Sequence, residues 1–255
     1  MFLKKLFRRA KAAPVPETSR FTLPDGERIY AIGDIHGRLD LFDALLAMIE
    51  ADNSARPPSK TGLILLGDLV DRGPESRGVV ERAMQLAAAP STVVLKGNHE
   101  ELLLRVCAGD DRVTAPFHRV GGRDTLLSYG VSPETYDACE LSDLPALAAA
   151  ALPMAHRDFL EAALDYHAVG DYLFVHAGIQ PGIPLEDQDA SSMRWIRHEF
   201  TGSDVDHGRM VIHGHTITPE IDAWPNRIGI DTGAYASGVL TAIGLEGTEH
   251  WFLQT

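Results

Sequence analysis

The sequence predicts an α/β fold in which helices cover β-sheet. Short apolar runs, bounded by glycine or polar residues, alternate along the chain with segments of helical apolar spacing. Each run leads directly into a polar motif. The chain has 255 residues, of which 45% are apolar and 23% charged, so it has the size and composition of one globular domain with a sizeable core.

The individual elements follow from the type of apolar pattern. Continuous apolar stretches predict buried strands over residues 29–32, 62–66, 92–95, 172–175 and 209–212. Helical spacing predicts crossover helices over residues 39–51 and 75–89. Residues 102–165 are rich in Ala and Leu and predict a helical insertion that borders the site. Alternating patterns predict strands of a second, largely antiparallel sheet over residues 227–231, 239–245 and 250–253.

The net charge of −13 is unevenly distributed. Residues 1–20 hold six basic side chains and one acidic side chain, so the remainder of the chain carries −18. Such an acidic body disfavours nucleic acid as a substrate, because binding to nucleic acid depends largely on Lys and Arg that neutralise phosphates. We assign residues 1–24 to a basic tail and linker and residues 25–255 to one domain. A short basic amphipathic segment can contact a membrane surface, but the Ala-Pro-Val-Pro-Glu stretch favours a solvated tail.

The cysteines and the N-terminus indicate the compartment. Cys107 and Cys139 lie far apart without a Cys-x-x-Cys pair, so neither a disulfide framework nor a zinc ribbon is indicated. The basic N-terminal residues are not followed by the apolar run of roughly 7–15 residues that a signal peptide requires. The sequence therefore predicts a cytoplasmic protein.

Five polar motifs follow the five predicted strands. They are Gly33-Asp-Ile-His-Gly37, Gly67-Asp-Leu-Val-Asp-Arg-Gly73, Gly97-Asn-His-Glu100, His176-Ala-Gly178 and His213-Gly-His-Thr216. In open α/β sheets the functional groups gather at the carboxyl ends of the strands, so we expect the five loops to converge on one site. Taken singly, an Asp-x-His is commonly a turn aspartate beside a surface histidine, and Asn98 could cap a helix. Five such motifs in order after five strands favour a shared site.

The residue types in these motifs are those of a two-metal hydrolytic centre. Asp34 and His36 are two residues apart, which directs both side chains to one side. Carboxylate and imidazole together suit Mn²⁺, Fe or Zn²⁺ better than Ca²⁺. Asp68 has two oxygens that can bridge two ions, and a second ion would be completed by Asn98, His176 and His215. We expect two divalent ions per chain, with Mn²⁺ preferred over Fe or Zn²⁺.

The ordered motifs resemble those of the calcineurin-like metallophosphoesterases. Gly-Asp-Leu-Val-Asp-Arg-Gly-Pro with Gly-Asn-His-Glu resembles the phosphoprotein phosphatase branch, in its bacterial Ser/Thr phosphatase form. The resemblance spans residues 33–216 and implies a four-layer α/β/β/α sandwich of two mixed sheets with a helical insertion. It also implies that Asp34 and His36 bind the first metal, that Asp68 bridges, and that the second metal is bound by Asn98, His176 and His215.

The resemblance gives roles to residues beside the metals. His99 would be the general acid, oriented by Asp71, and Arg72 would clamp the phosphate. Met193-Arg-Trp-Ile-Arg-His198 is similar to a Leu-Trp-x-Arg stretch of bacterial members, which makes Arg197 a second clamp, with Arg194 as the alternative. Tyr235 stands where the family has a tyrosine lining the site, and a packing role fits it equally well.

Two positions near the last motif depart from the wider superfamily pattern. Many members end in Gly-His-x-His, whereas Ile217 occupies the place of the last histidine here, which favours the phosphatase branch. His213 is two residues before His215 and could support a ligand or touch the substrate.

Together these observations predict a metal-dependent phosphomonoesterase. Its substrate would be a phosphoprotein or a small phosphorylated molecule, and the expected enzyme is a Ser/Thr or dual-specificity protein phosphatase in which a metal-bridging hydroxide attacks phosphorus in line. One alternative is a dinucleoside tetraphosphate (Ap4A-type) hydrolase, which the presence of Asp71 mildly disfavours. A second alternative is a non-catalytic, metal-bound interaction module, which is disfavoured because the ligands and the acid are all present.

Overall fold

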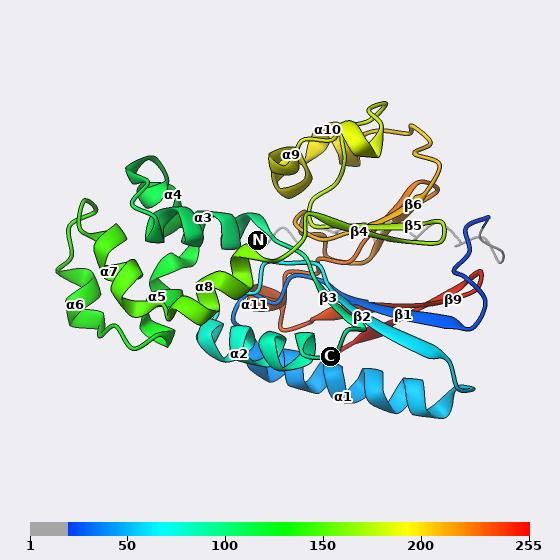
Figure 1. Cartoon of the computed structure of the whole chain (residues 1–255), viewed down its shortest axis with the longest axis horizontal. Helices are drawn as coiled ribbons and strands as arrows, with labels where there is room; N and C mark the ends of the chain where they lie inside the picture. Colours follow the sequence, from blue (N-terminus) through cyan, green and yellow to red (C-terminus); the bar gives the residue numbers. More distant parts are fainter. Residues whose placement is uncertain (1–19) are drawn as a thin grey trace, which may run out of the picture.

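Two five-stranded mixed sheets pack face to face in the computed structural model, which describes residues 20–255. Helices α1 (Leu39–Ala55) and α2 (Ser76–Ala87) cover the outer face of the first sheet. Helices α9 (Ala190–Trp195) and α10 (His198–Thr201) cover the outer face of the second (Figure 1). The predicted four-layer α/β/β/α arrangement of two mixed sheets is therefore confirmed.

The first sheet has the strand order β10-β9-β1-β2-β3. The three strands on one side of it are parallel and are joined by α1 and α2, as the predicted crossovers require. The other two strands run antiparallel to their neighbours. The bounds are β1 Glu27–Ile32, β2 Lys60–Leu65, β3 Thr92–Val94, β9 Thr241–Glu246 and β10 Glu249–Gln254.

The second sheet has the order β4-β5-β6-β8-β7, with three parallel strands in the middle and an antiparallel strand at each edge. The bounds are β4 Tyr166–Val169, β5 Tyr172–Val175, β6 Met210–His213, β7 Asp222–Trp224 and β8 Arg227–Gly229. The prediction that all three C-terminal strands belong to this sheet was wrong. β8 joins it in parallel to β6, whereas β9 and β10 join the first sheet through β1. An alternating pattern indicates a strand, but it does not encode a partner more than 200 residues away.

Strand β1 shows why these runs are apolar at every position. Ile29 and Ala31 face the second sheet, where they join the core between the two sheets. Tyr30 and Ile32 point to the other face and pack with the helices. Because both faces are covered, a period of two leaves no position free for a polar side chain.

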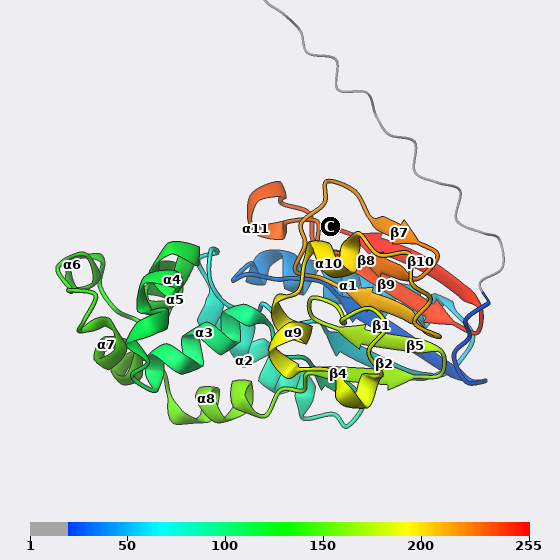
Figure 2. The same cartoon turned by 90° about the horizontal axis from the view of Figure 1, so that it is seen from above.

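The helical insertion forms the end of the molecule beyond the carboxyl ends of the first sheet's parallel strands (Figure 2). It begins with α3, whose first residue is already in the Gly-Asn-His-Glu motif, and its helices contribute to the larger core. The predicted helical region is therefore confirmed. Its helices are α3 Asn98–Cys107, α4 Thr114–Phe117, α5 Arg123–Ser128, α6 Pro133–Asp137, α7 Leu144–Ala151 and α8 Met154–Glu161, with short turns at Asp111–Val113 and His118–Gly122.

The N-terminal predictions fall mostly outside the described residues. The greater part of the basic tail, for which membrane contact was considered and not favoured, lies in residues 1–19. Phe21 and Leu23, in the expected linker, are buried in the core between the sheets. Among residues 20–255, no helix is both long enough and apolar enough to cross a membrane.

Candidate metal centre

The motifs converge at the carboxyl ends of five strands, as the sequence predicts. The chain turns sharply there, and five residues take a positive φ that side chains other than glycine rarely adopt. They are the only non-glycine residues with positive φ in the described chain, and all lie in the motifs: His36, Asp68, Asp71, Arg72 and His215. Gly97 and Gly214 admit the Asp68 and Asp34 carboxylates so closely that a Cβ atom at either position would collide with them. The backbone strain is concentrated where the side chains gather.

Two histidines are held in the tautomer that a metal ligand needs. His36 Nδ1 lies 2.8 Å from the Val70 carbonyl oxygen, and His176 Nδ1 lies 2.9 Å from that of Leu66. Because a carbonyl oxygen only accepts, each Nδ1 carries the proton and donates, which leaves a lone pair on Nε2. His176 Nε2 then faces Asn98 Oδ1 at 3.0 Å, so two acceptors approach each other. A cation between them would resolve this contact.

Asp68 stands at the middle of the cluster. It belongs to two groups of side chains whose ligand atoms lie within 4.8 Å of one another, one with His36 and His99 and the other with His176 and His215. This sharing agrees with the bridging role that the sequence predicts for Asp68. Asp34 lies beside the cluster, where its carboxylate accepts a hydrogen bond from the His215 backbone N–H at 3.0 Å.

The electrostatics of the cluster suit divalent cations. Burial lowers the pKa of His36 to about 3 and that of His215 to about 2, so both imidazoles are neutral. The Nε2 atoms of both are buried without a hydrogen-bond partner. Burial raises the pKa of Asp34 well above its usual value, and the nearby Asp231 and Asp68 carboxylates raise it further. Neutral imidazoles with free lone pairs beside crowded carboxylates fit a metal centre.

Glu100 braces the loop that carries Asp68, a role that the sequence analysis did not assign. Its carboxylate accepts hydrogen bonds from the backbone N–H groups of Asp68 at 2.8 Å, Leu69 at 2.8 Å and Gly97 at 2.9 Å. It is only 1% exposed, and burial raises its pKa to about 7. Its position three residues after Gly97 is the spacing of a capping box, which was the available signal.

His99 lies in a hydrogen-bonded chain that reaches the helical insertion. Its Nδ1 is 2.6 Å from Asp71 Oδ2, and Asp71 Oδ1 accepts from Thr125 Oγ1 at 2.6 Å. Burial alone would lower the pKa of His99, but the carboxylates of Asp68 and Asp71 outweigh it and raise the pKa. The Asp71–His99 pairing predicted from the sequence is thus present in the structure. Thr125 was missed because it is 54 residues from Asp71 and carries no local signal.

The predicted phosphate-binding residues are in different surroundings. The Arg72 guanidinium lies 3.2 Å from His99 Nε2 and packs over the Tyr235 ring at 4.6 Å. Arg197 is close enough to His176 and His215 to lower the pKa of both. Arg194 instead pairs with carboxylates, those of Glu101 at 3.2 Å and Asp165 at 3.5 Å. Arg194 is thus partnered by carboxylates, whereas Arg197 forms no ion pair with any side chain in residues 20–255.

His213 and Asp231 complete the surroundings. His213 is buried, and its ring packs against Phe200 at 5.1 Å and lies beside Gly229. It belongs to neither of the two metal-capable groups. Asp231, which the sequence analysis did not single out, lies against Asp34, and burial raises its pKa to about 6. Asp231 follows strand β8 just as the other motifs follow their strands. This position after a strand was the feature of the sequence that could have identified it.

A family comparison accounts for this geometry. The profile described as calcineurin-like phosphoesterase matches residues 27–223. The chain belongs to this family. It is therefore a hydrolase of the metallophosphoesterase type, and the His and Asp groups described above are able to bind its divalent metal ions. The predicted superfamily is confirmed, whereas its phosphoprotein phosphatase branch is not.

The curated relatives overturn the predicted substrate. A bis(5'-nucleosyl)-tetraphosphatase (symmetrical) from Acidovorax sp. (strain JS42) is 35% identical over 159 residues, which cover 62% of this chain and 47% of the relative. One of the same name from Nitrosospira multiformis is 30% identical over 198 residues, covering 73% and 60%. This chain thus matches about half the length of these relatives. The prediction of a Ser/Thr protein phosphatase acting on phosphoproteins was wrong, and Asp71 was not evidence against its rival. The motifs specify a metal centre for hydrolysis at phosphorus. They do not specify the group to which the phosphorus is attached.

Solved structures share the fold. One provisionally named a diadenosine tetraphosphatase has a TM-score of 0.64 at 21% identity and covers 93% of this chain and 98% of that chain. A cold-active protein tyrosine phosphatase has a TM-score of 0.58 at 16% identity, covering 88% and 77%. At these identities the likeness concerns the fold alone.

Proposed function

We propose that this protein is a metal-dependent hydrolase that cleaves dinucleoside tetraphosphates symmetrically. The observation that carries the proposal is its similarity to bis(5'-nucleosyl)-tetraphosphatases, which reaches 35% identity over 159 residues. The arginines around the metal centre support it, because a tetraphosphate carries more negative charge than a monoester and requires more positive charge along its length.

The proposed metal ligands are those expected from the sequence. Asp34 and His36 would hold the first divalent ion, Asp68 would be shared by both, and Asn98, His176 and His215 would hold the second. We propose two ions per chain, with Mn²⁺ as the first candidate. When bound, such ions supply Lewis-acid activation of water and of the phosphoryl group.

The remaining side chains handle the substrate and the leaving group. Arg72 binds phosphate oxygens, since its planar guanidinium is fixed over Tyr235 and forms no ion pair with any side chain in residues 20–255. Arg197 adds positive charge on the side of His176 and His215. Asp71 holds His99 Nδ1, and Nε2 lies 3.2 Å from the Arg72 guanidinium; when Arg72 engages phosphate, protonated His99 donates from Nε2 to the departing phosphate oxygen.

A substrate comparison tests the proposal. The purified chain is stripped with chelator, resupplied with Mn²⁺, Zn²⁺ or Fe²⁺, and assayed on diadenosine tetraphosphate, an aryl phosphate monoester and a phosphopeptide, while bound metal is counted. We expect the highest kcat/KM for the dinucleotide, with ADP as the sole nucleotide product. A higher kcat/KM for either monoester, or equal release of AMP and ATP, would contradict the proposal.

A matched pair of variants tests the site. Asp68→Asn removes one charge at the proposed bridge and should lower turnover by at least about a hundredfold, together with metal content. Asp111→Asn removes one charge from an exposed position on the insertion and serves as the control. Asp68→Asn with near-normal turnover would contradict the proposed role of the cluster.

A further inference from the structure

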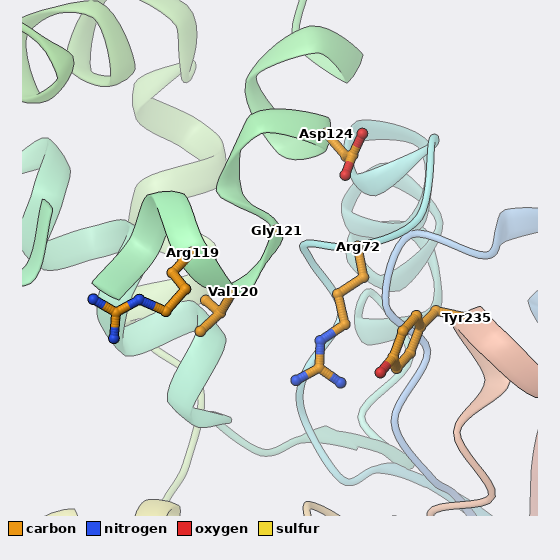
Figure 3. Close-up of a pocket in the computed structure, with 6 residues that line it drawn as sticks. All are labelled: Arg72, Arg119, Val120, Gly121, Asp124 and Tyr235. Atoms are coloured by element: carbon orange, nitrogen blue, oxygen red, sulfur yellow. The ribbon is translucent and has the colours of Figure 1, made fainter. Parts of the chain in front are cut away.

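A pocket of about 480 Å³ opens beside the metal centre, on the side of the helical insertion. Figure 3 shows the Arg72 and Tyr235 side chains next to each other, Val120 and Gly121 across from them, and Asp124 towards the backbone end of Arg72, away from its guanidinium. The volume is in the range of small-molecule sites, roughly 300–1,000 Å³. The lining residues are Arg72, Arg119, Val120, Gly121, Asp124 and Tyr235.

Arg72 belongs both to this pocket and to the metal centre. Arg72 lines the pocket, and its guanidinium lies 3.2 Å from His99 Nε2. A phosphate bound by Arg72 therefore lies at the boundary between the two. A group attached to that phosphate on the side away from the metal centre therefore lies next to the pocket.

Asp124 restricts what that group can be. Its side chain is partly buried, accepts a hydrogen bond from its own backbone N–H and forms no ion pair with any side chain in residues 20–255, so acceptor positions remain for a ligand. A carboxylate repels phosphate and binds hydrogen-bond donors. The ligand must accordingly present phosphate to Arg72 and uncharged or cationic donors to Asp124. A ribose with two neighbouring hydroxyls, linked to the phosphate through its 5' carbon, meets both conditions.

We propose that this pocket binds a nucleoside of the substrate, with Asp124 accepting hydrogen bonds from the ribose hydroxyls. Val120 and the ring of Tyr235 supply the less polar surface on which the base lies. This inference rests on the proposed function and adds to it a residue that selects the ribose. It also gives the helical insertion a role in substrate choice.

The pocket is built on the same framework as the proposed catalytic groups. Next to Asp124 in the chain, Thr125 donates to Asp71 Oδ1 at 2.6 Å, and the Gly121 carbonyl oxygen accepts from the Arg72 backbone N–H at 3.3 Å. Gly121 has a φ of 112°, and a Cβ atom there would lie 2.6 Å from the Arg72 nitrogen. The insertion and the Asp71–Arg72 loop thus fix Asp124 relative to the phosphate site before a ligand binds.

The test crosses an enzyme variant with a substrate variant. Wild type, Asp124→Asn and the control Asp111→Asn are loaded with metal and assayed on diadenosine tetraphosphate and on its analogue with 2',3'-dideoxyribose. For the natural ribose we expect Asp124→Asn to raise KM roughly tenfold or more, as loss of a hydrogen bond to a charged group implies. For the dideoxy analogue the wild type should show a similar rise, and Asp124→Asn should add less than about twofold, because the two changes remove one interaction.

Each outcome decides the inference. A dideoxy analogue that wild type binds as well as the natural substrate would overturn it without any variant, so a poorly folded Asp124→Asn would not obscure the result. Equal KM increases for both substrates in Asp124→Asn would also overturn the inference. They would show that the carboxylate acts through its charge and not through hydrogen bonds to the ribose hydroxyls. Failure of the wild type to cleave diadenosine tetraphosphate at all would instead sink the proposed function, and the inference with it.

Discussion

Replacing Thr125 by valine should weaken both the fold and catalysis, because the change removes a hydroxyl and keeps the shape. Thr125 is fully buried, donates to Asp71 Oδ1 at 2.6 Å and accepts from the Asp71 backbone N–H at 2.8 Å. A bond to a carboxylate contributes about 1.5–3 kcal/mol and a neutral one about 0.5–1.5 kcal/mol. Since Ser76 Oγ, at 3.0 Å, still accepts from the same N–H, we expect a loss of about 3 kcal/mol in unfolding free energy. This corresponds to a melting temperature lower by roughly 6–12 °C.

The effect on activity should appear in kcat. Thr125 touches the partner of His99 and not the substrate, so kcat should fall about tenfold while KM changes little. Thr125→Ser keeps the hydroxyl and loses one methyl group, which costs about 1 kcal/mol, and its kcat should remain near that of wild type. Thermal unfolding and steady-state hydrolysis of diadenosine tetraphosphate measure both quantities. Normal kcat in the valine variant, or equal loss in the serine variant, would refute a positioning role for the hydroxyl.

Three further perturbations address other parts of the structure. Glu100→Gln should weaken metal affinity about ten- to hundredfold, measured by calorimetric titration, because the charge that braces the Asp68 loop is lost. Burial alone would raise the pKa of Asp52, but hydrogen bonds from Tyr30, Arg56 and Trp251 outweigh it and hold this pKa below its usual 3.8. The Asp52 carboxylate therefore stabilises the fold above pH 3.8. This contribution is lost as the pH falls through the lower pKa of the folded state. Urea unfolding should show Asp52→Asn less stable than wild type at pH 7 by about 1–3 kcal/mol, with the gap narrowing below pH 3.8; a constant gap would contradict this. Chelation should lower the melting temperature of the metal-loaded protein, as calorimetry would reveal, because ions that bind only the folded state stabilise it.

The sequence was most informative about the metal-capable side chains. A parallel strand that ends in an Asp or His motif places that side chain at a known edge of the sheet, and five such strands determine a cluster. The structure brings Asp68, His36, His176 and His215 together as this reasoning requires. The assignment of individual ligands to two ions remains a prediction.

The residues that support the cluster were harder to predict, because their partners are distant in the chain. Glu100 was visible within its motif, yet its function depends on the Asp68 loop, which precedes it by about thirty residues. Thr125 reaches Asp71 only because the insertion folds back against the first sheet's loops. The placement of β9 beside β1 has the same origin, since pairing across more than 200 residues is decided by packing and not by local pattern.

Substrate choice is the property that the motifs leave undetermined, and the structure suggests why. The proposed metal ligands and the proposed Asp71–His99 pair would act on a phosphoryl group, whatever is attached to it. The neighbouring pocket is formed partly by insertion residues such as Val120 and Asp124, which lie outside every strand-end motif. A change in the insertion can therefore alter what is bound without disturbing the centre that acts on phosphorus. If Asp124 selects the ribose, the part of the chain that carries no recognisable motif is also the part that distinguishes a dinucleotide from other phosphate esters.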